Sequence, residues 1–389
     1  MSRVAGEAER ERLHDTFTSL CRLPSPTGEE RAVADWITCE LNELGIAVEE
    51  DDAGAAVGSS AGNLLARIPG RGERTLMLCS HMDTVPLTAP VEPVQRDNGW
   101  ENANEGILGA DNKAAVAAMV ELARIVSASA SRSARASGSA SASAPEVGVE
   151  LLFTVAEETG LNGAAQFDVA RLGSDFGYVF DHASPVGEII SASPTHMRID
   201  AEIRGRAAHA GLQPEQGVNA IVAAAQAIVN MPQGRYDEET TANVGLVSGG
   251  TGLNVVADRC VVAAEVRAVE QAQLDRYVTQ AIDALQDAAD TAGCDLDLKL
   301  QQGFTGYRLG RREPSVLLAQ RALRAIGYEP SFRSSGGGAD ANALRLNGFA
   351  CTNLANGTER AHERTERVSF TALEDNLDLM LTLLNEAAT

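Results

Sequence analysis

Short apolar segments alternate with helical patterns along the first half of this chain. Two apolar segments lie at residues 62–68 and 74–80, and buried-strand patterns follow at 148–155 and 177–180. Between them, Ala114–Val126 has the alanine-rich composition of a helix. Strands that alternate with helices are joined by crossovers, which favours a mostly parallel sheet flanked by helices. The sequence therefore predicts an α/β fold for this part of the chain.

Two further helices are predicted at the amino-terminal end. Residues 10–22 carry apolar side chains at helical spacing. After a break at two prolines, Thr27 and Glu30 fit a capping box, and an apolar stripe continues from there to about Leu44.

The pattern changes after residue 194, where the order becomes strand, helix, strand, strand, helix, strand. The six segments are Met197–Arg206, Gly217–Met231, Asn243–Val247, Val255–Val266, Gln273–Ala292 and Asp295–Leu300. The order βαββαβ is typical of a ferredoxin-like α+β domain. The α/β pattern then resumes, in the segments 314–326, near 330, 349–354 and 371–387. We therefore expect an inserted domain at 195–306, between two parts of one catalytic domain at 1–194 and 307–389.

Residues 127–145 differ from the rest of the chain in composition, because they are nearly all Ser, Ala, Gly and Arg. Such a segment lacks the apolar side chains needed for a core. We interpret it as a flexible low-complexity surface loop rather than a binding tail.

The charge balance limits the partners. The chain has 32 basic and 54 acidic side chains, a formal net charge of −22. This argues against nucleic acid and against an anionic membrane surface, both of which attract basic proteins. We see neither a signal peptide nor an apolar run of about 18 residues that would span a bilayer. The six scattered cysteines contain no C-x-x-C pair, which favours a reducing compartment, so we expect the cytoplasm.

Histidine and carboxylate side chains gather at the ends of the predicted strands and at one helix start. The set comprises His81, Asp83, Asp111, Glu157, Glu158, Asp181 and His362. Taken singly, each has an ordinary structural explanation, such as a helix N-cap for Asp111. Taken together they should meet, because the carboxyl ends of parallel strands lie at one rim of a sheet. Imidazole and carboxylate ligands with one spare glutamate suit a two-metal hydrolytic site.

At this point the sequence resembles the co-catalytic zinc exopeptidases and deacylases. That family includes peptidase T, the glutamate carboxypeptidases, succinyl-diaminopimelate desuccinylase and acetylornithine deacetylase. The similarity covers nearly the whole chain in order. It rests on Ser80–Val85, Gly109–Lys113, Ala156–Gly160, Ala208–Gly211, Gly249–Val256, Gly336–Asn342 and the region around His362. The forms Gly109–Lys113, Asp181–Gly187 and Asp340-Ala341-Asn342 look most like the peptidase T-like branch.

The resemblance implies two zinc ions, with cobalt or manganese as alternatives. His81 and Asp181 would bind one ion, Glu158 and His362 would bind the other, and Asp111 would bridge the two.

It also implies roles for neighbouring residues. Asp83 would orient the adjacent histidine ligand, and Glu157 would be the general base that deprotonates a metal-bridging water. In the inserted domain, which resembles the family's lid, His209 would contact the oxyanion of the tetrahedral intermediate, in many relatives from the partner subunit of a homodimer. Asn254 and Arg267 look like substrate-binding positions, although Asn254 also suits a turn and Arg267 a strand-end ion pair.

The prediction is thus a di-zinc metallo-exopeptidase that cleaves short peptides, of the tripeptide aminopeptidase type. The same metal site would serve an N-acyl-amino-acid amidohydrolase or a carboxypeptidase-type deacylase. A non-enzymatic alternative is an inactive metal-binding dimerisation module, against which the presence of Glu157 argues.

Three positions depart from the family pattern. Ala257 stands where many relatives have proline, Ala339 replaces the usual serine, and Glu363 follows His362 where relatives usually have threonine. None removes a ligand. The resemblance further predicts a non-proline cis peptide bond between Asp111 and Asn112.

Overall fold

The computed structural model describes residues 4–137 and 144–389, which form two compact units. The first unit contains the chain up to Ser191 together with Leu309–Arg333 and Ala339–Thr389. The second unit contains Ala192–Arg308 and the short segment Ser334–Gly338.

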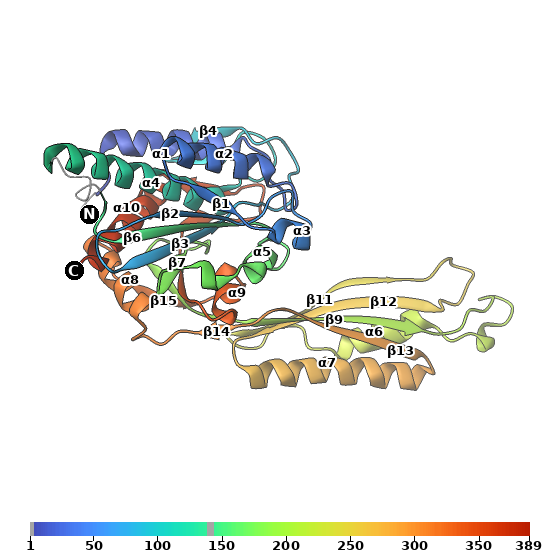
Figure 1. The fold of residues 1–389 in the computed structure, drawn as a ribbon. Coiled ribbons are helices and arrows are strands. Elements are labelled where there is room, and N and C mark those ends of the chain that lie inside the picture. The colour runs from blue at the N-terminus through green and yellow to red at the C-terminus, as the bar shows by residue number, and fades with distance from the viewer. Residues whose placement is uncertain (1–3, 138–143) are drawn as a thin grey trace. The chain divides into compact units, whose positions relative to one another are not determined.

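The first unit is built on a mixed sheet, of which Figure 1 labels β1, β2, β6, β3 and β7. The strands of this unit run in the order β1-β2-β6-β3-β7-β16-β8. Their bounds are β1 Val48–Glu50, β2 Leu64–Ile68, β3 Thr75–His81, β6 Gly148–Thr154, β7 Phe176–Val179, β8 Glu188–Ser193 and β16 Ala350–Leu354. The four central strands β6, β3, β7 and β16 pair in parallel, whereas β1 with β2, β2 with β6 and β8 with β16 pair antiparallel. One further strand, β15 (Ser331–Ser334), pairs with β8. The apolar runs of β3 and β6 are almost entirely buried, as expected for strands covered on both faces.

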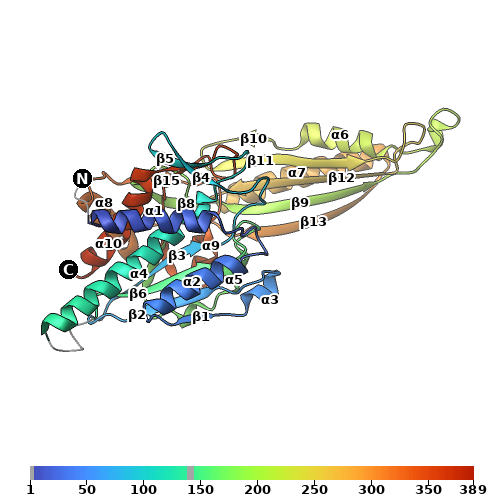
Figure 2. The ribbon, with the colours of Figure 1, turned by 90° about the horizontal axis from the view of Figure 1, so that it is seen from above.

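Helices cover both faces of this sheet. Figures 1 and 2 show α1 (Glu7–Cys21), α2 (Arg31–Glu43) and α4 (Ala110–Ser137) together on one face. On the other face, α8 (Pro314–Ala325) and α9 (Asp340–Leu346) contact β16 and β7. The final helix α10 (Phe370–Ala387) packs against α4 and α8. The described part of the unit also contains the short helices α3 (Ala53–Val57), α5 (Asn162–Gln166) and η2 (Val169–Arg171).

A small antiparallel sheet in the same unit has the order β17-β18-β5-β4. Its strands are β17 Thr358–Glu359, β18 Arg367–Ser369, β5 Gly99–Asn102 and β4 Pro93–Arg96. The hairpin of β17 and β18 closes a loop at residues 360–366, and this loop carries His362.

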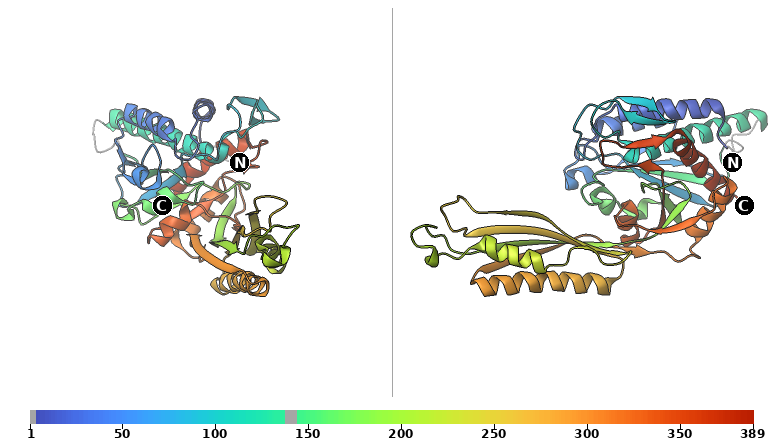
Figure 3. Two further views of the ribbon diagram at one scale, coloured as in Figure 1. Left: turned by 90° about the vertical axis from the view of Figure 1, so that its right-hand side faces the viewer. Right: turned by 180° about the vertical axis from the view of Figure 1, so that it is seen from behind.

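The second unit has an antiparallel sheet of order β10-β11-β12-β9-β13. The strands are β9 Thr195–Arg204, β10 Gly234–Arg235, β11 Thr240–Gly249, β12 Arg259–Ala268 and β13 Asp295–Phe304. The helices α6 (Ala220–Asn230) and α7 (Gln271–Ala292) contact each other and lie on one face of the sheet (Figure 3). A 3-10 turn, η3 (Pro214–Gln216), precedes α6, and β14 (Tyr307–Arg308) pairs with Ala192 and Ser193. The elements follow one another along the chain as β9, α6, β11, β12, α7 and β13, and β9 lies between β12 and β13 in the sheet. This arrangement is that of a split βαβ unit.

The glycine-rich segment 334–338 belongs to the second unit, although it lies within the range 307–389 that is predicted for the second part of the catalytic domain. Its backbone is held there by side chains of the second unit. Arg267 donates to the Gly336 carbonyl at 3.3 Å, and the Ser193 hydroxyl donates to the Gly337 carbonyl at 2.9 Å. Glycine offers no side chain to a core, so these backbone contacts decide where the segment lies.

The predicted loop at 127–145 is wrong for its first part, because α4 continues as a helix to Ser137. Residues 127–137 are all Ser, Ala or Arg, with neither Gly nor Pro. No residue in this stretch therefore interrupts the helix. Residues 138–143 of the predicted loop lie outside the described residues.

The predicted capping box of Thr27 and Glu30 is also wrong. The hydroxyl of Thr27 donates to the Asp83 carboxylate instead, and the Glu30 carboxylate accepts from the backbone N–H groups of Gly28 and Ala156. The bonds from Thr27 to Asp83 and from Ala156 to Glu30, which join distant parts of the chain, therefore replace the predicted local cap. Within residues 4–137 and 144–389, none of the helices combines the length and the apolar character that a membrane span requires.

Asn63 joins the strand β2 to the segment that follows β6. Its side-chain oxygen accepts from Val155 N at 3.1 Å, and its amide donates to the Asp51 carboxylate and to the Gly163 carbonyl, each at 2.9 Å. We predict that Asn63→Ala lowers the free energy of unfolding of the metal-free protein by about 1–3 kcal/mol, because buried backbone groups lose their partners. Urea denaturation followed by circular dichroism measures the change. The matched variant Asn42→Ala, on an exposed face of α2, should stay within about 0.5 kcal/mol of wild type, and equal losses in the two variants would contradict the assignment.

Candidate metal centre

His81 and Asp83 form the base of the site, at the carboxyl end of β3. His81 is the last residue of this strand and is buried. Its Nδ1 lies 2.9 Å from the Asp83 carbonyl oxygen and 3.4 Å from Asp83 Oδ1. A carbonyl only accepts, so in the neutral imidazole Nδ1 carries the proton and Nε2 keeps its lone pair. The second nitrogen is thereby free to act as a ligand.

The Asp83 carboxylate also links β3 to the segment after β6. It accepts hydrogen bonds from Thr27 Oγ1 at 2.7 Å, from Glu157 N at 3.0 Å and from Glu158 N at 3.2 Å. These bonds fix the backbone from which the two adjacent glutamates project. Asp83 is therefore a fully hydrogen-bonded buried carboxylate that orients its neighbours.

Two groups of potential ligands share Asp111. In the first group, His81 Nε2 lies 3.4 Å from Asp111 Oδ1 and 3.7 Å from Asp181 Oδ1. In the second group, His362 Nε2 lies 3.5 Å from Asp111 Oδ2 and 3.0 Å from Glu158 Oε2. The potential ligand atoms within each group all lie within 4.8 Å of one another. Asp111 thus turns one oxygen to each group.

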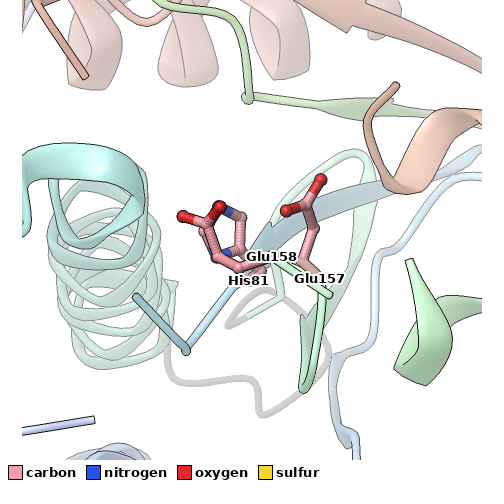
Figure 4. A group of neighbouring side chains, drawn as sticks. All are labelled: His81, Glu157 and Glu158. Atoms are coloured by element: carbon pink, nitrogen blue, oxygen red, sulfur yellow. The ribbon is translucent and has the colours of Figure 1, made fainter. Parts of the chain in front are cut away.

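Glu157 lies beside these groups. His81, Glu157 and Glu158 form a third set whose polar atoms lie within 4.8 Å of one another. Figure 4 shows that the side chains of Glu157 and Glu158 leave adjacent backbone positions in different directions. One of the two carboxylates can therefore join a ligand group while the other remains available for proton transfer.

The crowding of these groups changes their pKa values. Burial, reinforced by the charge of Asp181, raises the pKa of Glu157 well above its ordinary value. Burial likewise raises the pKa of Asp181, against the favourable effect of the His81 imidazolium. Burial opposes protonation of His81, but the carboxylates of Asp181 and Asp111 outweigh it and raise the His81 pKa well above its ordinary value.

The pKa of His362, the more exposed of the two histidines, is also raised. Hydrogen bonds to Asp111 and Glu158 raise the pKa of His362 to about 10. Burial would raise the pKa of Asp111, but the nearby imidazolium rings of His362 and His81 lower it instead. In the absence of a metal, protons on two histidines therefore supply the positive charge that the carboxylates need.

The donor set fits divalent cations. Imidazole nitrogen and carboxylate oxygen are zinc ligands, and a carboxylate common to both groups is the usual bridge between two ions. The Oδ1 atom of Asp111 is buried and has no hydrogen-bond partner among residues 4–137 and 144–389, so it keeps a free lone pair toward the first group. The peptide bond between Asp111 and Asn112 is cis, which confirms that prediction.

The remaining predicted residues, His209, Asn254 and Arg267, all belong to the second unit. His209 is exposed, and its Nδ1 accepts from Gly211 N at 3.1 Å, which leaves Nε2–H free to donate. The Asn254 side chain is exposed, and the backbone carbonyl of Asn254 accepts from Ala210 N at 2.9 Å. The Arg267 guanidinium forms an ion pair with Glu265 through Nε at 3.0 Å, so it already has a partner.

Two residues of the site were missed in the sequence. Asn353, on β16, accepts from Asp181 N at 3.0 Å and donates to the Asp181 carbonyl at 2.8 Å. Glu366 lies in the His362 loop and bonds to the backbone around Asp111. The only available signal was position, since Asn353 sits near the end of a predicted strand and Glu366 follows His362 closely.

Comparison with known protein families matches two parts of the chain. Residues 63–181 match the model of peptidase family M28, and residues 192–292 match the M20 peptidase dimerisation domain.

Similar proteins extend over the whole chain. The uncharacterized protein YqjE of Bacillus subtilis (strain 168) is 33% identical over 378 residues, which are 97% of this chain and 98% of that protein. The crystal structure of aminopeptidase PepT from Bacillus cereus superposes with a TM-score of 0.85 at 35% identity, covering 98% of this chain and 99% of that one. A tripeptidase structure from Staphylococcus aureus gives a TM-score of 0.88 at 32% identity, covering 97% and 98%.

The raised pKa values predict how protons and metal compete. Because the pKa of His362 is raised to about 10 and that of His81 is raised well above its ordinary value in the metal-free protein, both rings should lose a proton when Zn²⁺ binds at pH 7. Zn²⁺ affinity should therefore fall as the pH is lowered. Calorimetric titration in buffers of different ionisation enthalpy counts the released protons, and His362→Asn should release about one proton fewer than wild type. Zn²⁺ binding without proton release would contradict the assignment of these ligands.

Proposed function

This chain belongs to the M20 peptidase family and is a hydrolase of peptide or amide bonds, and we propose that it is a two-metal exopeptidase acting on short peptides. The observation that carries the proposal is the pair of ligand groups sharing Asp111, with Glu157 alongside. A single-metal site would need neither the shared carboxylate nor the second histidine.

The ligands of the proposed metals follow from the two groups. His81 and Asp181 would hold one ion, Glu158 and His362 the other, and Asp111 both. Zinc is the ion that best suits this donor set, with cobalt or manganese as alternatives. When bound, two such ions polarise the scissile carbonyl and lower the pKa of water.

Glu157 is the proposed general base and general acid. The residue is 9% exposed, and its backbone N–H donates a hydrogen bond to the Asp83 carboxylate. Its raised pKa makes its carboxylate a stronger base than an ordinary glutamate, so it can accept a proton from the attacking water. The same proton is then available for the leaving amine.

The substrate class rests on relatives. Two structures that cover nearly all of this chain carry the names aminopeptidase and tripeptidase, which supports cleavage at the amino end of tripeptides. We propose the same class here, in preference to N-acyl amino acids and carboxypeptidase substrates.

The second unit is proposed to serve substrate binding and dimerisation. The free Nε2–H of His209 would donate to the oxyanion, while Asn254 and Arg267 would bind the peptide, the latter after exchanging its partner Glu265. The match of residues 192–292 to a peptidase dimerisation domain supports a homodimer formed through this unit. Exposed apolar side chains on it, such as Leu246, Val229 and Leu253, are available for such a contact. We also propose a cytoplasmic location, supported by cysteines that are all free.

Replacement of the general base tests the mechanism. We predict that Glu157→Gln lowers kcat on tripeptides by about 100- to 10,000-fold, because the amide cannot accept the proton, while both metals still bind. For wild type, kcat/KM should fall as the pH is lowered through the pKa of Glu157, since only the carboxylate is active. Glu105→Gln, at a side chain that is 94% exposed, is the control and should match wild type. A panel of di- and tripeptides beside N-acyl amino acids measures the activity, and wild-type turnover by Glu157→Gln, or cleavage of N-acyl amino acids alone, would refute the proposal.

Light scattering tests the proposed assembly. At micromolar concentration we expect a mass about twice that of one chain, because the exposed apolar surface of the second unit should be covered by a second copy. The double variant Leu246→Asp and Val229→Asp should yield one chain mass. A monomeric wild type would exclude a catalytic role for the partner's copy of the second unit.

A further inference from the structure

Glu366 is a buried carboxylate in the loop between β17 and β18, and its side chain is directed at a distant backbone segment. The residue is 2% exposed. Its Oε2 accepts from Leu108 N and from Gly109 N, each at 2.8 Å, and its Oε1 accepts from Asp111 N at 2.8 Å. Both carboxylate oxygens thus accept hydrogen bonds from the backbone of residues 108–111.

Within residues 4–137 and 144–389, Glu366 is the acceptor that the structure gives for these three N–H groups. The first N–H groups of a helix lack partners within the helix, and here α4 begins at Ala110. Gly109 has a positive φ of 76°, and Asp111 has φ −83° and ψ 104°, so neither follows a helical path. Removing the acceptor would leave three N–H donors unpaired, two of them fully within the interior.

The same loop carries His362, only a few residues before Glu366. One short loop therefore supplies His362 to the second ligand group and also accepts a hydrogen bond from the backbone of Asp111, the residue that the two groups share. Asp111 turns Oδ1 to His81 at 3.4 Å and Oδ2 to His362 at 3.5 Å. This division requires the Asp111 backbone to keep a fixed position relative to the His362 loop, although the bonded residues are 255 positions apart.

We infer that Glu366 is a positioning residue of the metal centre, which acts through Asp111 by holding its backbone against the His362 loop. The carboxylate does not join either ligand group itself. Its function is to keep the two oxygens of Asp111 aimed at the two groups at once. The inference rests on the proposed two-metal site.

A purely structural role has a close comparison in the same unit. Glu150, on β6, is 3% exposed and accepts from the backbone N–H groups of Gly173 and Ser174 at 2.9 and 3.0 Å. It satisfies buried donors as Glu366 does, but the segment it holds carries none of the proposed ligands. Loss of Glu150 should therefore weaken the fold without changing metal binding.

The test compares Glu366→Gln with Glu150→Gln in the full-length metal-free protein. A glutamine offers one acceptor oxygen, so at position 366 at least one of the three N–H groups would face an amide donor. Titration with Co²⁺ alone, followed by calorimetry and by visible absorption of the bound ion, reports affinity and coordination without an activity assay. We expect wild type to bind two equivalents, and Glu366→Gln to bind the weaker one about 10- to 100-fold less tightly with an altered spectrum. Glu150→Gln should bind both equivalents as wild type does, whatever its urea midpoint.

The outcomes separate the inference from the proposed function. A wild type that binds fewer than two equivalents overturns the two-metal proposal itself. A wild type that binds two, with a folded Glu366→Gln that binds both equally well, overturns the positioning role alone. If Glu366→Gln does not fold, Glu366→Asp keeps the charge but shortens the side chain by about 1.5 Å. Weakened Co²⁺ binding in a folded Glu366→Asp then supports the inference, and wild-type binding rejects it.

Discussion

Mutual repulsion among five buried or half-buried carboxylates is the constraint on which the site depends. Asp83, Asp111, Glu157, Glu158 and Asp181 meet at the rim where the parallel strands end. Among the residues that the structure describes, their ion pairs are all with His81 and His362. Buried like charges are unfavourable unless cations offset them, which is why the pKa values of both histidines rise. A fold that holds these groups together against repulsion is one built to bind cations.

Much of this arrangement could be predicted from the sequence, because it follows from the ends of regular elements. His81 ends a buried strand, and Glu157 and Asp181 follow two others, so a parallel sheet necessarily brings them to one rim. The apolar runs of β3 and β6 and the periodicity of α7 and α10 are strong enough to identify these elements. The roles of the site residues stay predictions.

What could not be predicted depends on contacts between distant residues. The strands β17 and β18 are too short to have a periodicity, yet their hairpin presents His362. Thr27 donates to Asp83 instead of capping a helix, and Glu366 bonds to N–H groups more than 250 positions away. Hydrogen bonds of this kind use a side chain and a backbone group that no local pattern connects. The extension of α4 to Ser137 was missed for a different reason, because a Ser- and Ala-rich composition suits both a helix and a loop.

Anomalous diffraction at the zinc absorption edge, on crystals of the zinc-loaded protein, tests the central claim most directly. We expect two peaks about 3.5–4 Å apart, each within about 2.0–2.2 Å of a different oxygen of Asp111. One peak should also contact His81 and Asp181, and the other Glu158 and His362. A single peak in the zinc-loaded crystal, or two peaks that do not share Asp111, would contradict it.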